Sequence, residues 1–397
     1  MLEVEFAGIK LKNPVIAASA TPTINLDGLR RAAEGGAGAI VTKSAVFPKK
    51  VVEGMEYVKG RPTGLKPSPR FMLLNKGETY DPALTNEGSY FTLFRVGEPY
   101  LKPEELVEMI EKIKKSVNIP VIASIAGAVD DLEEWQKLAK PMQEAGADAV
   151  ELNLHAIPIV KYTNPDIVRA VKEVVSIPVI AKLMYGWEDP AELGSKVERA
   201  GADAITAVGT FGFPTMEIDV EAPRILTQPS YYGAGGPWYR PVSLAFVSRL
   251  AKTVKIPVLG VTGVVTWKDA VKYIMVGATA VQVCAAIYAK GYRVLGEIAM
   301  GIEEFMRRKG YQKIDDFRGS ILKEIVPPWK LEWGPPIKAT VDEASCDGCG
   351  DCVESCFYGA ISLEENLASI DSDKCDGCGL CVWVCASKAV AMEKQRV

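Results

Sequence analysis

Residues 119–153 read IPVIASIAGAVDDLEEWQKLAKPMQEAGADAVELN and contain the unit from which most of this chain is built. A short apolar strand starts at Ile119, a helical pattern follows over residues 130–145, and a second apolar strand starts at Gly146. Short continuous apolar runs are typical of parallel strands that are covered on both faces. The stretch therefore predicts a strand–helix–strand unit of a parallel α/β fold.

The same two strand types alternate along the first 285 residues. One type starts with Asn-Pro-Val or Ile-Pro-Val, and the other starts with Gly-Ala-x-Ala, where the glycine suits the end of the preceding helix. The first type begins at Asn13, Ile119, Ile177 and Ile256, and the second at Gly36, Gly146, Gly201 and Gly277. Strict alternation through eight strands predicts an α/β fold that closes as a (β/α)8 TIM barrel, in preference to an open doubly wound sheet.

Two connections are far longer than a plain strand-to-helix turn. They comprise residues 44–102 and residues 209–242. Both follow the C-terminal end of a predicted strand, and this end of a barrel is where active sites are built. We therefore expect the two insertions to cover the active site.

Composition places the chain among ordinary globular proteins, with 397 residues, 48% apolar residues and a net charge of −4. The near-balanced charge gives no reason to expect a nucleic-acid or membrane partner. The longest nearly apolar run, residues 274–289, is shorter than the ~20 residues of a spanning helix. No secretory signal is visible at the N-terminus, so we expect a cytoplasmic protein. The sequence leaves its oligomeric state open, a homo-oligomer included.

Eight of the nine cysteines form two runs of the pattern C-x2-C-x2-C-x3-C between residues 346 and 385. In bacterial ferredoxins the fourth thiolate of each such run ligates the other cluster. A zinc site usually has two C-x-x-C pairs around a longer spacer, so the doubled runs favour clusters. We expect a 2[4Fe–4S] ferredoxin-like domain over residues 336–397, after a barrel over residues 1–335. One [4Fe–4S] cluster would be bound by Cys346, Cys349, Cys352 and Cys385, and the other by Cys375, Cys378, Cys381 and Cys356.

Lys43 and Lys182 stand where two of the predicted strands end. A lysine at the mouth of an apolar barrel needs an anionic partner, because an unpaired buried ammonium is very costly. That partner is either a neighbouring carboxylate, such as Glu151, or an anionic ligand such as a phosphate or a reduced flavin. Small residues after the seventh and eighth strands suit a phosphate, although they also simply let a strand turn into a helix.

No G-x-G-x-x-G motif follows a predicted strand, so the sequence gives no support for a dinucleotide site. Two clusters without such a site describe a one-electron relay. A flavin is the natural group to couple that relay to a two-electron substrate. The expected partners are therefore a small-molecule substrate and a redox protein, either a ferredoxin or a subunit that oxidises NAD(P)H through FAD.

Across roughly residues 1–395 the chain resembles the dihydroorotate dehydrogenase superfamily. It is most similar to the FMN barrel and C-terminal two-cluster module of dihydropyrimidine dehydrogenases. The matching motifs are ASA at 18–20, TKS at 42–44, ELN at 151–153, AKL at 181–183, GAGGPWYRP from Gly233, GVTGV and QVCAA. The resemblance implies an FMN- and iron–sulfur-dependent oxidoreductase acting on a CH–CH or C=C bond. It places around FMN the residues Ala18, Ser19, Lys43, Asn153, Lys182, Gly235, Thr262, Gly263, Cys284 and Ala285.

The substrate motif departs from the family pattern. The family has Leu-Asn-x-Ser-Cys-Pro after the fourth strand, whereas residues 152–158 read LNLHAIP. Ala156 stands at the position of the family's acid/base and cannot transfer a proton. His155, the only histidine, is either its replacement or a structural side chain beside the flavin.

The family's Asn-Thr after the sixth strand is replaced by Gly209-Thr210, which predicts an altered substrate pocket. By the resemblance, the substrate contacts would be Asn75, Asn153 and Thr210. The catalytic set would be His155, Asn153 and Lys43.

Two other functions compete with this interpretation. The first is an electron-transfer subunit of a flavin and iron–sulfur complex without a small substrate of its own. The second is a lyase that uses Lys43 or Lys182 as a Schiff base, and a bound flavin would argue against it.

Overall fold

The computed structural model describes residues 1–47, 71–74, 91–95, 101–128, 130–154, 162–184, 186, 188–209, 211–215, 218–219, 224–225, 232–327, 330 and 337–394. The chain divides into two compact units, Met1–Glu324 and Ile325–Val397. Within the described residues, no helix is long and apolar enough to cross a membrane.

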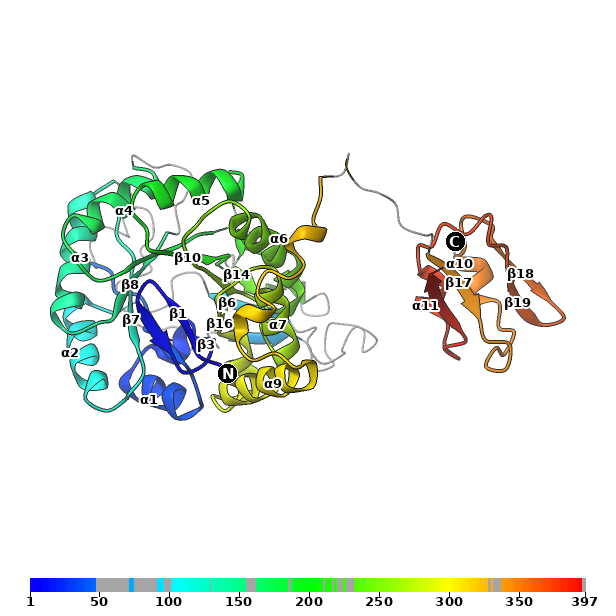
Figure 1. The fold of residues 1–397 in the computed structure, drawn as a ribbon, viewed down its shortest axis with the longest axis horizontal. Helices are drawn as coiled ribbons and strands as arrows, with labels where there is room; N and C mark the ends of the chain where they lie inside the picture. Colours follow the sequence, from blue (N-terminus) through cyan, green and yellow to red (C-terminus); the bar gives the residue numbers. More distant parts are fainter. Residues whose placement is uncertain are drawn as a thin grey trace. The chain divides into compact units, whose positions relative to one another are not determined.

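The first unit is built on a closed barrel of eight parallel strands, which confirms the predicted fold class (Figure 1). Each strand starts within two or three residues of one of the repeated motifs, and β16 pairs with β3 to close the barrel. In spatial order the strands are β3 (Val15–Ala17), β4 (Ala39–Val41), β7 (Val121–Ile125), β8 (Ala149–Asn153), β9 (Val179–Lys182), β10 (Ala204–Ala207), β15 (Val258–Val261) and β16 (Ala280–Val283).

Helices surround the barrel strands (Figure 1). Several begin at a side chain that accepts a hydrogen bond from the first helical turn, as Asn25 and Asp131 do for Gly28 and Glu134. The helices are α1 (Leu26–Glu34), α2 (Pro103–Lys114), α3 (Leu132–Glu144), α4 (Asn164–Lys172), α5 (Pro190–Arg199), α6 (Arg240–Ala251), α7 (Trp267–Met275), α8 (Ala285–Lys290) and α9 (Val294–Lys309).

The barrel interior is filled from its N-terminal end. Inward-pointing apolar residues of the strands pack there, among them Ile16, Ile122 and Leu259. The hairpin of β1 (Val4–Phe6) and β2 (Ile9–Leu11) adds Phe6 and Leu11 to the same cluster. Because this end is filled by apolar side chains, the polar residues at the other end of the strands mark the open face.

The two long insertions contribute strands to one sheet. The first insertion supplies β5 (Phe71–Leu74) and β6 (Phe91–Arg95), and the second supplies β11 (Phe211–Thr215) and β14 (Tyr232–Gly235). The order is β11-β14-β6-β5, so β14 pairs with β6 across about 140 residues of sequence. A short hairpin of β12 (Ile218–Asp219) and β13 (Arg224–Ile225) also lies in the second insertion. The sequence predicts two separate insertions, and the structure joins them.

The second unit contains two similar halves. Its strands pair as β17 (Ile337–Val341) with β20 (Val390–Lys394), and β18 (Ile361–Glu364) with β19 (Leu367–Ile370). A one-turn helix lies within each cysteine run, α10 (Asp351–Ser355) in the first and α11 (Leu380–Val384) in the second. Cys352 and Cys381, at equivalent positions on these helices, are buried in the small core.

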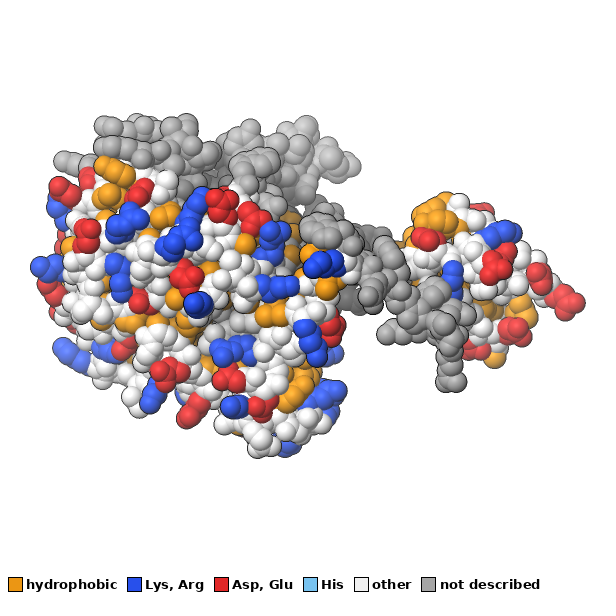
Figure 2. Space-filling view, turned by 45° about the horizontal axis from the view of Figure 1, so that its top comes forward, with side chains coloured by type: hydrophobic (Ala, Val, Ile, Leu, Met, Phe, Trp, Pro, Cys, Tyr) orange, Lys and Arg blue, Asp and Glu red, His pale blue; other side chains and the backbone are white. Residues whose placement is uncertain are grey.

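Charged residues of both signs are mixed over the barrel unit. Figure 2 shows basic and acidic side chains interspersed on the visible face, without a large field of one sign. This distribution agrees with the near-balanced composition of the whole chain.

Candidate active site and cluster sites

Polar side chains gather at the C-terminal ends of β4, β8 and β9. Asn153 and Lys182 are register partners at the ends of β8 and β9, and Lys43 lies two residues after the end of β4. Glu151 lies two residues before Asn153, so both side chains point into the barrel. Strand register therefore brings these predicted site residues to one end of the barrel.

Lys182 is held by a carboxylate. Its Nζ lies 3.1 Å from Oε1 of Glu151 and 3.4 Å from Oε1 of Gln282, and Oε2 of Glu151 accepts from the hydroxyl of Thr206 at 2.9 Å. All four side chains are buried. Of the two partners that the sequence allows for this ammonium, the structure contains the carboxylate.

A row of hydroxyl groups lies beside this cluster. Ser44 Oγ is 2.8 Å from Ser124 Oγ and 3.5 Å from Ser19 Oγ, and it accepts from Nδ2 of Asn153 at 3.3 Å. Lys43, next to Ser44 in sequence, is also buried. Oδ1 of Asn153 is buried and has no hydrogen-bond partner among the described residues.

An unpaired buried acceptor of this kind costs about 1–3 kcal/mol. A ligand at the barrel mouth that donates an N–H hydrogen bond to Asn153 Oδ1 would remove this cost. The ring system of a flavin carries such a donor, so the residues present fit a flavin in this respect.

The loop after β15 has a fixed backbone with left-handed residues. Thr262 has φ +80° and its hydroxyl donates to the carbonyl of Val208 at 2.8 Å. Gly263 has φ +77°, and a Cβ there would lie 2.7 Å from Cβ of Arg240. The hydroxyl of Tyr273 donates to the carbonyl oxygen of Thr262 at 2.6 Å, and burial raises the pKa of this phenol. A side chain at position 263 would collide with Arg240, so this loop requires glycine there.

The remaining predicted flavin contacts come from several other elements. Ala18 follows β3 and is buried, and Gly235 ends β14, where its carbonyl accepts from the indole N–H of Trp238 at 2.9 Å. Cys284 and Ala285, half-buried, mark the step from β16 into α8. His155, Asn75 and Thr210 lie outside the described residues.

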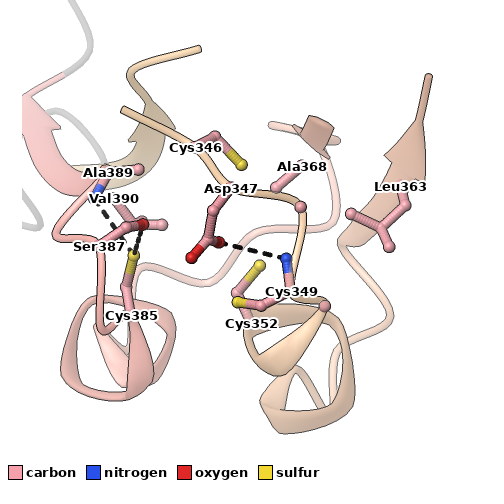
Figure 3. A pocket seen from close by; sticks show the side chains of 12 residues that line it. Cys346, Asp347, Cys349, Cys352, Leu363, Ala368, Cys385, Ser387, Ala389 and Val390 are labelled. Atoms are coloured by element: carbon pink, nitrogen blue, oxygen red, sulfur yellow. Dashed lines mark hydrogen bonds between the residues drawn. The ribbon is translucent and has the colours of Figure 1, made fainter. Parts of the chain in front are cut away.

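In the second unit, four thiols line one small pocket. Cys346, Cys349 and Cys352 come from the first run, and Cys385 comes from the end of the second run (Figure 3). The Cys385 sulfur accepts from the amide of Ala389 at 3.2 Å and lies 3.5 Å from the hydroxyl of Ser387. The Ser387 hydroxyl lowers the pKa of the Cys385 thiol, while burial raises that of Cys352.

A second small pocket has the equivalent lining. Cys375, Cys378 and Cys381 come from the second run, and Cys356 comes from the end of the first. The Cys356 sulfur accepts from the amide of Ala360 at 3.4 Å. The structure thus brings the eight thiols together in the two groups of four that the spacing predicts. Among the described residues, no three histidine, cysteine, aspartate or glutamate side chains form a group that could bind a single metal ion. Each group of four thiols instead lines a pocket of its own.

Comparison with known proteins agrees with this geometry. The family model for dihydroorotate dehydrogenase matches residues 1–306, and that for a 4Fe-4S dicluster domain matches residues 345–395. The chain belongs to the dihydroorotate dehydrogenase family. Its cofactors are FMN, which this family binds, and two [4Fe–4S] clusters, so the predicted cofactors and the predicted oxidoreductase class are confirmed.

Curated relatives fall into two groups by coverage. The catalytic subunit of dihydroorotate dehydrogenase B (NAD(+)) from Pyrococcus abyssi is 36% identical over 332 residues, covering 81% of this chain and 100% of the relative. The same subunit from Methanosarcina mazei is 34% identical, covering 79% and 92%. The NAD-dependent dihydropyrimidine dehydrogenase subunit PreA of Escherichia coli K12 is 28% identical over 376 residues, covering 90% of this chain and 86% of the relative.

One departure from the pattern expected of this family has a visible structural basis. Gly209 stands where the resemblance to the family implies an asparagine. A Cβ at Gly209 would lie 2.9 Å from the sulfur of Met184, and the Gly209 amide donates to the carbonyl of Leu183 at 2.8 Å. The thioether of Met184 therefore occupies the space into which an amide side chain would start.

Sequence reasoning missed part of the polar cluster of this dihydroorotate dehydrogenase relative. Thr206 and Gln282 lie inside otherwise apolar strands, β10 and β16, and both bond Glu151. A polar residue at an inward position of an apolar strand is a detectable feature. Its partners, however, depend on which strands the barrel brings together.

Proposed function

We propose that this chain is a flavin and iron–sulfur enzyme that interconverts a C=C bond and a CH–CH bond in a small molecule of the pyrimidine type. Residues 1–335 would form the FMN barrel, and residues 336–397 the ferredoxin domain. Electrons would pass between the flavin and an external redox protein through the two clusters. We expect this reaction in the reducing environment of the cytoplasm, where the thiolates remain available for iron.

One observation carries the proposal. The same chain combines a barrel mouth that holds an unpartnered buried amide oxygen, that of Asn153, with two cavities each lined by four thiols. A flavin exchanges a hydride with a carbon of the substrate and single electrons with clusters. The relatives include subunits whose names specify NAD(+) or NAD, whereas this chain has no dinucleotide motif. A partner would therefore connect this chain to its electron source or acceptor.

The proposed roles follow from position and chemistry. Asn153 would accept from the ring of the flavin or substrate. Lys43 and Lys182 would supply positive charge at the mouth, that of Lys182 being paired with Glu151. The loop of Thr262 and Gly263, with the start of α8 at Ala285, would offer backbone N–H groups to the phosphate end of FMN. Ala18, Ser19, Gly235 and Cys284 would complete the flavin site.

The acid/base is assigned to His155. Ala156 has no proton to give, and the ordinary pKa of a histidine side chain suits acid/base work near neutrality. Asn75 and Thr210 would contact the substrate with Asn153. Gly209 and Met184 would form one wall of the substrate pocket, with a thioether where the family has an amide. The part of the substrate that faces this wall should therefore differ from the corresponding part of a plain dihydropyrimidine.

The first experiment is anaerobic purification of the full chain. FMN, iron and labile sulfide are measured per chain, and the visible spectrum is recorded during reduction. We expect about one FMN and eight irons per chain. Orotate, uracil and thymine are then added to the reduced protein, and dihydroorotate and dihydrouracil to the oxidised protein. Return or loss of the flavin band identifies the substrate, and a protein that binds no FMN would contradict the proposal.

Two variants test the acid/base assignment with those compounds. H155N should lower turnover of the compound that works by roughly 10²–10⁴-fold, the usual contribution of a general acid, with FMN content unchanged. A156C restores the family's acid and should raise turnover of dihydroorotate or dihydrouracil. Equal rates for H155N and the unmodified enzyme would assign the proton transfer to another group. If no compound reacts while clusters and flavin still exchange electrons, the chain acts as an electron-transfer subunit instead.

A further inference from the structure

A closed cluster of four buried polar side chains lies inside the barrel, one layer below Asn153. Its centre is the carboxylate of Glu151, which is fully buried. Oε1 contacts the Lys182 ammonium at 3.1 Å, and Oε2 accepts from Thr206 at 2.9 Å and from the amide of Gln282. Gln282 also donates to Thr206 at 3.1 Å and lies 3.4 Å from Lys182. Both carboxylate oxygens are therefore occupied within the cluster.

This cluster carries one positive and one negative charge. An isolated carboxylate inside the barrel would be very costly, and Lys182 compensates it. The reverse also holds: the positive charge of Lys182 is partly cancelled before it reaches any ligand at the mouth. At an effective dielectric constant of about 20, opposite charges this close interact strongly.

Partial cancellation of the Lys182 charge affects the reduction of a flavin bound at this mouth. This consequence rests on the proposed function. Reduction places negative charge on the flavin ring, which an unopposed lysine would stabilise, and the flavin would become easier to reduce. Ferredoxin-type clusters exchange electrons at low potentials. A flavin that is too easily reduced would not return electrons to them.

We propose that Glu151 is a positioning residue that holds Lys182 in place and, by its own charge, keeps the flavin difficult to reduce. The potential of the flavin is then matched to the clusters by a carboxylate that touches neither flavin nor substrate. Thr206 and Gln282 orient that carboxylate through their hydrogen bonds to its Oε2 atom.

The test uses the intact holoenzyme and its E151Q variant. Sulfite adds to oxidised flavins and leaves negative charge on the ring, so its dissociation constant reports the same electrostatic field. We expect E151Q to raise the flavin midpoint potential and to lower the sulfite dissociation constant at least about tenfold, with cluster potentials unchanged. An FMN-containing E151Q protein with the potential and sulfite affinity of the unmodified enzyme would overturn the proposal.

D203N is the matched control. Asp203 pairs with Lys172 at 2.8 Å, and its carboxylate accepts from the amide of Val179 at the opposite end of β9 from Lys182. The substitution removes the same charge next to the same strand, but at the filled end of the barrel. Its sulfite dissociation constant should change less than about twofold, because screening and distance weaken the effect. A tenfold change in D203N would show that the effect is not specific to Glu151 and would contradict the proposal.

A second variant covers the case in which E151Q does not fold. The double substitution E151Q/K182Q removes both charges and leaves the net charge of the cluster unchanged. Its sulfite dissociation constant should stay within about threefold of the unmodified enzyme. Weakening by tenfold or more would mean that Lys182 acts unopposed, which overturns the role of Glu151. Failure of the proposed function itself is seen separately, as a purified unmodified protein without FMN.

Discussion

The barrel and the tail assemble their cofactor sites in opposite ways. In the tail, all eight thiols lie between Cys346 and Cys385, and three of each four come from one loop. In the barrel, the residues that meet at the mouth are far apart: the contacts Asn153–Ser44 and Gln282–Glu151 join residues separated by 109 and 131 positions. A local motif thus defines each cluster site, while closure of the whole barrel defines the site at the barrel mouth.

The relatives support the same distinction. The Pyrococcus abyssi relative is matched over its full length by 81% of this chain, so about a fifth of this chain has no counterpart there. The Escherichia coli relative is matched by 90% of it. Relatives thus match different shares of this chain, which agrees with two units that each have their own core.

The largest effect should follow from C381S. Cys381 is buried in the tail core and lines the second cavity, so loss of its thiolate should release one cluster. Iron and labile sulfide should fall by about half, and electron transfer to an external carrier by at least roughly a hundredfold, while FMN content stays constant. Iron analysis and single-turnover reduction measure these changes. C284S is the control, because this cysteine lies outside both runs and its loss should leave the iron content unchanged. Loss of FMN in C381S would show that the two sites are not independent.

K182M should destabilise the barrel without affecting the clusters. It leaves the Glu151 carboxylate buried without its ammonium, and breaking such a buried pair costs about 3–5 kcal/mol. The midpoint of barrel unfolding should fall by on the order of 10 °C, measured by far-ultraviolet circular dichroism under anaerobic conditions. K114M is the matched control, since the Lys114–Asp148 pair at 2.7 Å is about one-third exposed and is worth less than about 1 kcal/mol. Equal losses in both variants would contradict the role of burial.

Within the tail, two glycines separate backbone strain from steric collision. Gly348 and Gly350 both have left-handed φ values, +69° and +83°. A Cβ at Gly348 would lie 2.2 Å from the carbonyl oxygen of Asn366, whereas one at Gly350 would meet only the Leu363 side chain at 3.6 Å. Both alanine variants carry a strain of about 1–2 kcal/mol, and G348A should lose about 1–3 kcal/mol more. Cluster release is monitored by visible absorbance, and it should be faster in G348A than in G350A. Faster release in G350A would mean that the backbone at Asn366 moves at little cost to accommodate the added Cβ.

The smallest effect should come from a local contact within the barrel. Asp166 in the first turn of α4 accepts from the hydroxyl of Thr163 at 2.6 Å and from its amide at 3.0 Å, and these bonds lower the pKa of the carboxyl. Its stabilising effect is thus present above the unfolded pKa of about 3.9 and is lost as the pH falls through the lower folded value. D166N should cost less than about 1 kcal/mol. The difference in unfolding midpoint should be constant from pH 5 to 8, and a change within that range would point to another titrating group.

Sequence alone determined the parts that depend on short-range pattern. The repeated strand starts predicted the eight-stranded barrel, because an apolar run bounded by Pro or Gly carries its own strand and turn preferences. The two cysteine runs predicted two clusters and grouped the thiols, because three ligands on one loop fix most of each site. The residues placed around the flavin came from matching motifs, and their roles remain predictions.

Tertiary structure decided the contacts that depend on register and closure. The sequence names Glu151 only as one possible partner of a lysine, and the fold decides that Lys182 faces it. The fold also decides that Thr206 and Gln282 complete the cluster and that β14 pairs with β6. Each of these contacts joins strands or loops whose separation in sequence says nothing about their distance in space. A side chain that points into a barrel meets whichever strands the closed sheet places beside and across from it, and only the completed fold fixes that choice.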